Sequence, residues 1–187
     1  MLAYFFPLSV CKLLQLFVIF YITLINLFSN PNRSVHLVSS NCDKAQYISR
    51  CLELAILLEV SADKPGNVNF VVGFEGTRAE HFLASAVAAG PSFQEAAYRG
   101  INVSEKKLAA DKVGLGELIK YAVKDIRLWQ KGGNTLLGTI MLFEPIAVAA
   151  GMTPTKEDYK FDFTELRKNI DLTVKATTAQ DSVKLYE

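Results

Sequence analysis

Apolar residues recur at helical spacing from residue 43 onward, and they predict a series of helices. In residues 43–62 they stand three or four positions apart, which is typical of one face of a helix that packs on a core. These positions are Ala45, Ile48, Cys51, Leu52, Ala55 and Leu58. The pattern then predicts a second helix over residues 78–90 that ends at Gly90, and a short third helix that begins at Pro91 and ends at Gly100.

Two longer segments complete the pattern of a helical bundle. Residues 115–133 are amphipathic and have one apolar face. That face consists of Leu115, Leu118, Ile119, Ala122, Ile126 and Trp129. Residues 134–150 are apolar on all sides, so we expect a central, buried helix there. Alternation typical of a strand is confined to a weak signal at residues 67–74, and the sequence therefore predicts an all-α fold, a multi-helix bundle.

The last residues of the chain begin a further helix. Thr178 is a favourable N-cap, and Asp181 follows three residues later in the position of a capping box. The helix is cut at Glu187, so that Val183 and Leu185 lack the next turns that would bury them. We therefore expect the chain to be truncated relative to a larger fold.

The first thirty residues form a separate hydrophobic segment. No charge occurs between Lys12 and Arg33, and the apolar run approaches the roughly 20 residues that span a bilayer. This pattern predicts either a membrane anchor at residues 13–29 on a cytoplasmic domain, or an upstream extension that is not part of the working protein. The predicted organisation is a hydrophobic segment (1–30), a linker (31–41) and an incomplete all-α domain (42–187).

The charge balance and the cysteines exclude several classes of function. The chain has 20 lysine and arginine residues against 19 aspartate and glutamate residues, so no overall positive field favours nucleic acid. Its three cysteines show no CxxC spacing, which argues against a zinc ribbon and against a disulfide framework. Partners and chemistry must therefore be sought in individual clusters of residues.

Gly132, Gly133, Asn134 and Thr135 precede the central apolar helix and form the first such cluster. One Asn or Thr is enough to cap a helix, whereas two glycines also let the backbone lie close to a ligand. Free N–H groups and the positive end of the helix dipole would favour an anion such as phosphate. The alternative is a simple Gly-Gly turn between two helices, because no P-loop lysine follows.

Other polar side chains gather at further predicted helix ends. Lys64 could contact phosphate as a point charge, and Arg78 offers a planar guanidinium fork. Glu59, Glu75 and Glu80 are carboxylates that could hold Mg²⁺ beside phosphates. As alternatives, Lys64 and Arg78 are solvated surface charges, and Glu80 is a first-turn acid that suits the helix dipole.

His81 and Ser85 are four residues apart and share one face of a predicted helix. A Ser–His pair suggests a nucleophile with its base, but a nucleophile also needs an orienting acid and an oxyanion site. The sequence places neither beside this pair, so a packed or surface histidine is the competing interpretation.

Three segments in this order and spacing resemble one family. They are EVSADKPGNV (59–68), FEGTRAEHFLASAVAAG (74–90) and GGNTLLGTIMLFEPIAVAAG (132–151), and the likeness runs from about Ala45 to the C-terminus. The chain is similar to the triphosphoribosyl-dephospho-CoA synthase family, above all to its archaeal branch. The resemblance implies an all-α transferase that joins the triphosphoribosyl group of ATP to the ribose 2′-hydroxyl of dephospho-CoA and releases adenine.

The resemblance also implies where the substrates bind. Gly132, Gly133, Asn134 and Thr135 would border the nucleotide site, and Lys64, Gly66 and Asn67 would lie at the same pocket. We further assign His81 and Ser85 to substrate binding, Glu75 and Arg78 to catalysis, and Glu59 with Glu75 to a Mg²⁺ ion. Nucleotide and CoA-type small molecules are the expected partners, with a membrane through residues 13–29 and without nucleic acid.

One departure from the family pattern leaves a second hypothesis open. Where relatives have an acid in the second motif, this chain has Gly76. The alternative is therefore a catalytically silent, truncated helical domain that binds a nucleotide or a partner without turnover. A hydrolase of the all-α ADP-ribosyl type is more distant, because aspartates that could converge on metals are scarce around these motifs.

Overall fold

The computed structural model describes residues 41–62, 67–155 and 161–187, and within them the regular elements are all helices. The elements in chain order are α2 (Asn41–Ser61), α3 (Ala79–Ser104), the 3₁₀-helix η2 (Ala110–Lys112), α4 (Leu115–Trp129), α5 (Leu137–Met152), α6 (Phe163–Lys175) and α7 (Ala179–Tyr186). The predicted all-α fold is confirmed. The doubtful strand at 67–74 is replaced by a single bridge between Phe74 and Thr77.

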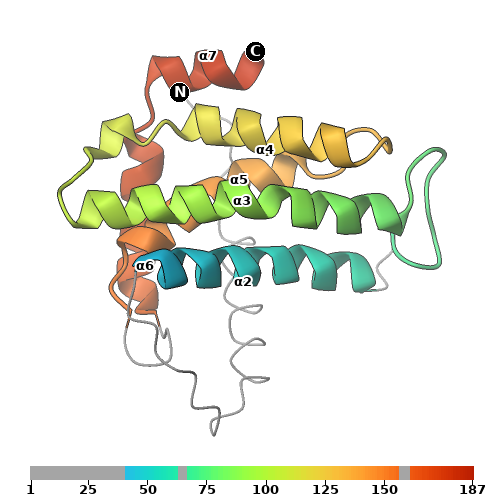
Figure 1. The fold of residues 1–187 in the computed structure, drawn as a ribbon, viewed down its shortest axis with the longest axis horizontal. Helices are drawn as coiled ribbons and strands as arrows, with labels where there is room; N and C mark the ends of the chain where they lie inside the picture. Colours follow the sequence, from blue (N-terminus) through green and yellow to red (C-terminus); the bar gives the residue numbers. More distant parts are fainter. Residues whose placement is uncertain (1–40, 63–66, 156–160) are drawn as a thin grey trace, which may run out of the picture.

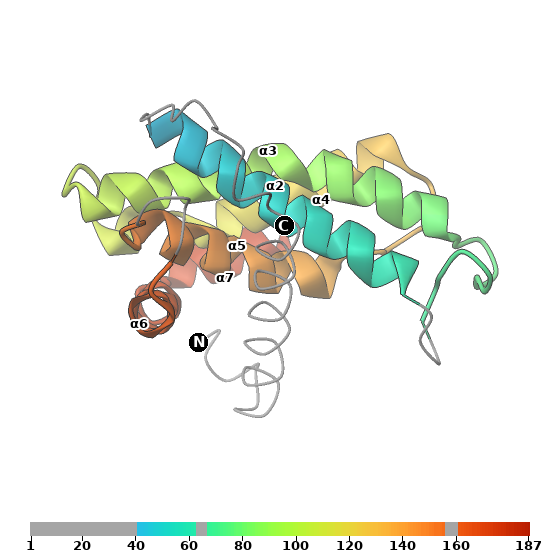
Figure 2. The same ribbon diagram turned by 90° about the horizontal axis from the view of Figure 1, so that it is seen from below.

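Helix α3 is the centre of the bundle and packs against α2, α4 and α5. Figure 1 shows α2, α3 and α4 side by side, with α5 behind them. Helix α6 packs on α5 and is seen end-on in Figure 2, while α7 covers α4. The core between these helices is built on fully buried side chains such as Phe93, Ile140 and Val148.

One continuous helix, α3, replaces the two helices predicted on either side of Pro91. The prediction of two helices is wrong because Gly90 and Gly100 allow close packing of α3 against its neighbours and do not end a helix. A Cβ atom at Gly100 would stand 1.9 Å from the Val148 carbonyl oxygen of α5, and one at Gly90 would stand 2.5 Å from Oε1 of Glu53 on α2. Packing on both neighbours outweighs the roughly 3 kcal/mol that an interior proline costs a helix.

The two helices beside α3 follow the hydrophobic pattern with small differences. Every predicted face position of α4 is buried except Trp129, which is 63% exposed because it is the last residue of the helix. Helix α5 begins at Leu137 and not at Asn134, and the predicted complete burial holds for its second half, while Leu137 and Gly138 at its start are exposed.

The capping box predicted at Thr178 is present and has a second use. The Thr178 N–H donates to Asp181 Oδ2 at 2.8 Å, and the Asp181 N–H donates to Thr178 Oγ1 at 3.3 Å. Asp181 Oδ1 also accepts from the Gly116 N–H at 2.9 Å, at the start of α4. Helix α4 has no side-chain cap of its own, so α7 supplies the acceptor.

Glu144 of α5 carries a carboxyl group that is fully buried in the core. Among the described residues, neither of its side-chain oxygens has a hydrogen-bond partner. Ser92 is close, but its hydroxyl donates to the Leu118 carbonyl oxygen at 3.0 Å. Burial raises the pKa of Glu144 to about 8, and Ser92 and the charge of Arg99 oppose this rise only in part.

In the part of the chain that the structure describes, none of the helices combines the length and the hydrophobicity that crossing a bilayer requires. The hydrophobic segment at 1–30, with its predicted anchor at 13–29, lies outside the described residues.

Candidate functional site

The turn between α4 and α5, residues 130–136, is held in shape by its own side chains. The Gln130 amide donates to the Gly133 carbonyl oxygen at 2.9 Å and accepts from the Gly132 N–H. Gly133 has a φ of 78°, in the left-handed region that favours glycine. Asn134 Oδ1 accepts from the Leu137 N–H at 3.1 Å, so Asn134 satisfies the first turn of α5 from outside the helix.

Gly132 is required for a different reason, because it lies against His81. A Cβ atom at residue 132 would stand 2.3 Å from the Nδ1 atom and 2.4 Å from the Cγ atom of that imidazole. Thr77 Oγ1 donates to the Gly132 carbonyl oxygen at 2.8 Å. The two glycines therefore combine a close approach with a left-handed turn, and the turn is joined to the start of α3.

Ser85 extends this junction into the core. Its hydroxyl is fully buried, donates to the His81 carbonyl oxygen at 2.6 Å and lies 2.7 Å from Thr135 Oγ1. His81 Nδ1 accepts from the Arg78 N–H at 3.1 Å at the start of α3. The structure thus brings His81, Ser85 and the turn together, and buried Ser85 is placed to position Thr135.

The described residues of the first motif (59–68) pack against the start of α3 through apolar contacts. Val60 of α2 and Val68 form a small buried cluster with Ala79, the first residue of α3. Asn67 Nδ2 donates to Glu59 Oε1 across the loop. Lys64 and Gly66, which we assign to substrate binding, lie outside the described residues.

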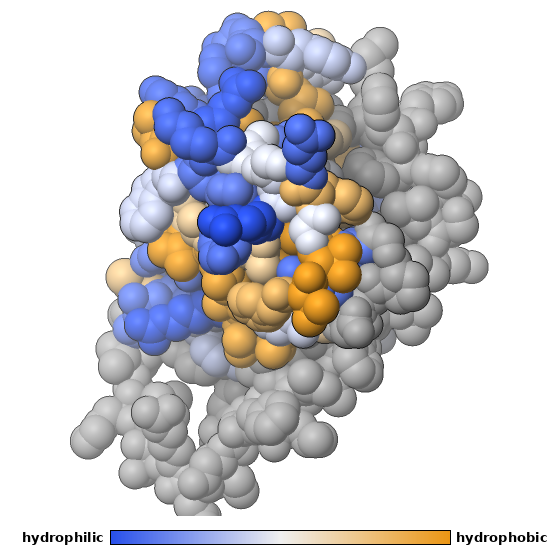
Figure 3. Space-filling model, turned by 90° about the vertical axis from the view of Figure 1, so that its right-hand side faces the viewer, coloured by the Kyte–Doolittle hydropathy of each residue, from blue (hydrophilic) through white to orange (hydrophobic). Residues whose placement is uncertain are grey.

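Glu75 and Arg78, the predicted catalytic residues, lie in the exposed loop before α3. The loop is closed by reciprocal backbone hydrogen bonds between Phe74 and Thr77, at 2.9 and 3.0 Å, and Gly76 takes a φ of 76° inside it. Arg78 is 3.7 Å from Glu80, and both side chains are well exposed. Figure 3 views the end of the molecule that carries this loop and the α4–α5 turn, where hydrophilic and hydrophobic side chains lie next to each other.

The predicted metal ligands do not form a complete site among the residues described. No group of three or more histidine, cysteine, aspartate or glutamate side chains lies close enough there to hold a metal ion. Glu59 is hydrogen-bonded to Asn67. The described residues therefore do not fit a metal held mainly by protein ligands, and the roles of Glu59 and Glu75 as ligands stay predictions.

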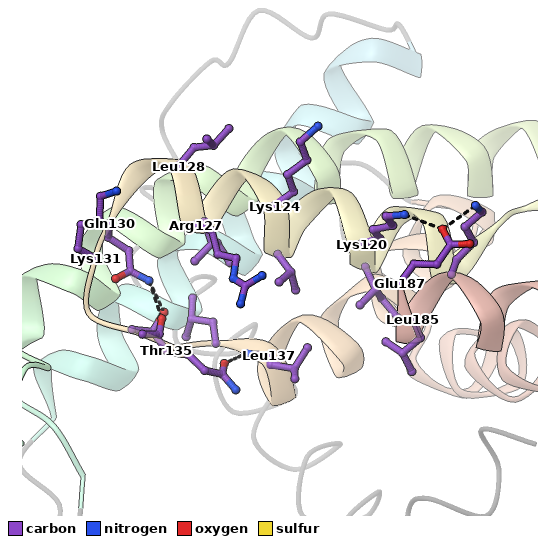
Figure 4. Close-up of a pocket in the computed structure, with 17 residues that line it drawn as sticks. Lys120, Lys124, Arg127, Leu128, Gln130, Lys131, Thr135, Leu137, Leu185 and Glu187 are labelled. Atoms are coloured by element: carbon purple, nitrogen blue, oxygen red, sulfur yellow. Dashed lines mark hydrogen bonds and ion pairs between the residues drawn. The ribbon is translucent and has the colours of Figure 1, made fainter.

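A groove of about 760 Å³ starts at the turn and runs between α4, the beginning of α5 and α7. Gly133, Asn134 and Thr135 line one part of it, and Leu185 and Glu187 line another. This volume is within the range of small-molecule sites. In Figure 4 the turn and α7 lie at opposite ends of the groove, so the turn has an extended cavity beside it.

Five cations line the groove, and our sequence analysis did not identify them as a group. They are Lys120, Lys124, Arg127, Lys131 and Lys184, with Glu187 as the carboxylate among the lining residues. Lys120, Lys124 and Arg127 are spaced by four and three residues on α4, which places them on one face of the helix, and Lys131 follows in the turn after α4 ends at Trp129. That spacing is a signal in the sequence, but only the packing of α5 and α7 beside α4 makes it part of a cavity.

Comparison with known proteins agrees with the motifs that meet at this turn. The family model for ATP:dephospho-CoA triphosphoribosyl transferase (CitG) matches residues 45–187, which include all three motifs. Searches of curated proteins and of solved structures gave no significant match. Because the match spans most of the chain, this protein belongs to the ATP:dephospho-CoA triphosphoribosyl transferase family.

Proposed function

We propose that the protein transfers the triphosphoribosyl group of ATP to the ribose 2′-hydroxyl of dephospho-CoA, or of a related acceptor, and releases adenine. One observation carries the proposal beyond family membership. The turn at 130–136 is fixed against Thr77 and His81 and at the same time lines the groove. Two family motifs that are distant in sequence thus meet beside a cavity of suitable size.

The reaction exchanges one bond for another at C1′ of the ATP ribose. The acceptor hydroxyl oxygen forms a bond to C1′ while the bond from C1′ to N9 of adenine breaks. Adenine leaves with the bonding electron pair, and the hydroxyl proton ends on the released base. We assign Glu75 to accept that proton in transit, and Arg78 to hold the triphosphate through its guanidinium fork.

The triphosphate of ATP is assigned to the turn. Gly133 and Asn134 are exposed at the groove, and α5 directs the positive end of its dipole toward them from Leu137. Lys64, Gly66 and Asn67 would add contacts from the loop after α2. In this proposal Mg²⁺ enters with ATP, bound mainly by phosphate oxygens, as is usual for this ion.

Calorimetry with ATP, with and without Mg²⁺, tests the binding step, and chromatography of adenine released with dephospho-CoA present tests transfer. Asn134→Ala removes the acceptor for the Leu137 N–H and loosens the turn, so we expect about tenfold weaker ATP binding. Gln46→Ala, which removes an exposed amide from α2, should bind ATP like the wild type. Equal ATP affinity in Asn134→Ala and the wild type would count against this assignment.

A silent nucleotide- or partner-binding domain is the second candidate, and Gly76 favours it. In the resemblance to the family, Gly76 takes the place expected for an acid, and its left-handed φ gives the glycine a structural reason. No atom lies within 4 Å of a Cβ atom built there, and aspartate tolerates this region better than most residues. Gly76→Asp should therefore fold. Adenine release that appears only in Gly76→Asp would support the silent domain, and release by the wild type would exclude it.

A further inference from the structure

Two cations of α4 and one of the α4–α5 turn are available for an anionic ligand. Lys124, Arg127 and Lys131 are exposed, and within the described part of the chain none of them forms an ion pair. Lys120, a further cation of α4, lies 2.6 Å from Glu187, which also pairs with Lys184 at 2.8 Å. Among the described residues, the cations near the turn are therefore unpaired, whereas the two lysines near α7 share one carboxylate.

The shape of the groove adds a second requirement for its ligand. In Figure 4 the Arg127 side chain lies between α4 and α5, and Lys124 extends from the outer side of α4. Between Arg127 and α7 the groove is also lined by apolar side chains, Leu137 at the start of α5 and Leu185 of α7, the latter beside the charged Lys120 and Glu187. The groove has further apolar lining residues, which are Ile119, Val123, Ile126 and Leu136. A matching ligand has phosphate groups near the turn and an uncharged arm that covers apolar side chains.

We propose that this groove binds the acceptor, a nucleoside diphosphate that carries an uncharged arm, with its diphosphate on Lys124, Arg127 and Lys131. This inference rests on the proposed function, because dephospho-CoA is the substrate with that order of groups. Its diphosphate then lies at the three unpaired cations, its ribose next to the ATP bound at the turn, and its pantetheine arm along Leu137 and Leu185.

The assignment separates the two substrates of the reaction. ATP occupies the turn, on the side of Thr77 and His81, and the acceptor occupies the groove on the side of α4. The 2′-hydroxyl of the acceptor ribose then meets C1′ of the ATP ribose at the one segment that borders both, Gly133–Thr135. Arg127 acts as a binding residue for the acceptor, since a guanidinium pairs with two phosphate oxygens at once.

The test measures binding of dephospho-CoA by calorimetry without ATP, so that turnover is not needed. The triple variant Lys124→Gln, Arg127→Gln, Lys131→Gln should bind dephospho-CoA at least about tenfold more weakly than the wild type, and ATP within about twofold. The control Lys112→Gln, Arg167→Gln, Lys168→Gln removes the same charge from η2 and α6 and should leave both affinities unchanged.

The apolar arm has its own test. Leu185→Ala should weaken binding of dephospho-CoA but leave ADP, which has the diphosphate without the arm, bound as in the wild type. If the triple variant does not fold, Arg127→Gln alone, with the salt dependence of dephospho-CoA binding in the wild type, serves in its place. Salt-independent binding would then overturn the assignment.

The outcomes distinguish this inference from the proposed function. Unchanged dephospho-CoA affinity in the triple variant, or a loss of ATP affinity instead, would overturn the groove assignment even if the wild type releases adenine. Specific, charge-dependent binding of dephospho-CoA by a wild type that never releases adenine would support the groove and reject the transferase activity. A wild type that binds no dephospho-CoA at all would overturn the inference.

Discussion

Gly132 of the α4–α5 turn lies against the imidazole of His81 so closely that a Cβ atom at residue 132 would stand 2.3 Å from Nδ1. His81 is itself fixed at the start of α3 by the Arg78 N–H. The turn cannot approach α3 more closely because of the imidazole, and it cannot move away without breaking the hydrogen bond from Thr77 to Gly132. This contact therefore sets the position of the turn relative to α3. The position of residues 130–136 then determines which of their groups border the groove.

Gly132→Ala should displace the turn and weaken ATP binding by about tenfold, because the new methyl group needs the space of the imidazole. Gly138→Ala is the matched control. No atom lies within 4 Å of a Cβ atom there, so alanine should stabilise α5 by about 0.5–1 kcal/mol. Calorimetry and thermal unfolding of both variants check this pair, and wild-type ATP affinity in Gly132→Ala would show that the turn tolerates displacement.

The Ser85–Thr135 hydrogen bond should be visible as an energetic coupling. Ser85→Ala and Thr135→Val each remove one of the two hydroxyls, which lie 2.7 Å apart, and each should lower the free energy of unfolding by about 1 kcal/mol. The double variant should lose clearly less than the sum of the two. Ser104→Ala, whose hydroxyl bonds locally to Ile101 at an exposed position, is the control. Simple additivity in urea unfolding would mean that the pair does not hold the turn.

Glu144 should make the protein less stable as pH rises. Its pKa in the fold is about 8 against an ordinary value of 4.5, so the folded state keeps a proton that the unfolded chain has released between these values. The free energy of unfolding should therefore fall from about pH 5 to pH 8, with a slope of at most about 1.4 kcal/mol per pH unit. Glu144→Gln should flatten this dependence, whereas the control Glu165→Gln, at a partly exposed position on α6, should not. Parallel pH profiles for the wild type and Glu144→Gln would contradict the assignment.

Asp181 should have the opposite effect on stability, which should fall as pH is lowered. Burial alone would raise the pKa of Asp181, but hydrogen bonds from the backbone of Thr178 and Gly116 hold it below its ordinary value of 3.8. Its contribution to stability is thus present above that pH and lost as pH falls through the lower, folded pKa. Asp181→Ala should cost about 1–3 kcal/mol at pH 7, because it leaves the Gly116 N–H without its acceptor. Asp171→Ala, which removes a surface ion pair with Lys175, should change stability by less than about 1 kcal/mol.

Local patterns predicted much of the fold correctly. The spacing of Ala45, Ile48 and Leu52 located α2, and the pair of Thr178 and Asp181 located the start of α7. Both signals depend on residues within one or two turns of each other, so they do not require knowledge of the rest of the chain. The same is true of the three motifs, whose order identified the family before any geometry was known.

Other features could not be predicted because they depend on partners far away in sequence. Gly90 and Gly100 resemble helix ends locally, and only contact with α2 and α5 shows that they allow close packing inside α3. The three cations of α4 and Lys131 after it resemble solvated surface charges until α5 and α7 are placed beside them.

The sequence alone thus determined the all-α class, α2, α4, the start of α7 and the family, since periodicity, capping and motif order are properties of neighbouring residues, whereas α6 was not predicted and α3 was predicted as two helices. The tertiary structure decided that Gly132 touches His81, that Asp181 caps a helix 65 residues away, and that Glu144 loses its contact with water. Each of these depends on which backbone or side chain occupies a particular volume, and that is fixed only when the helices pack.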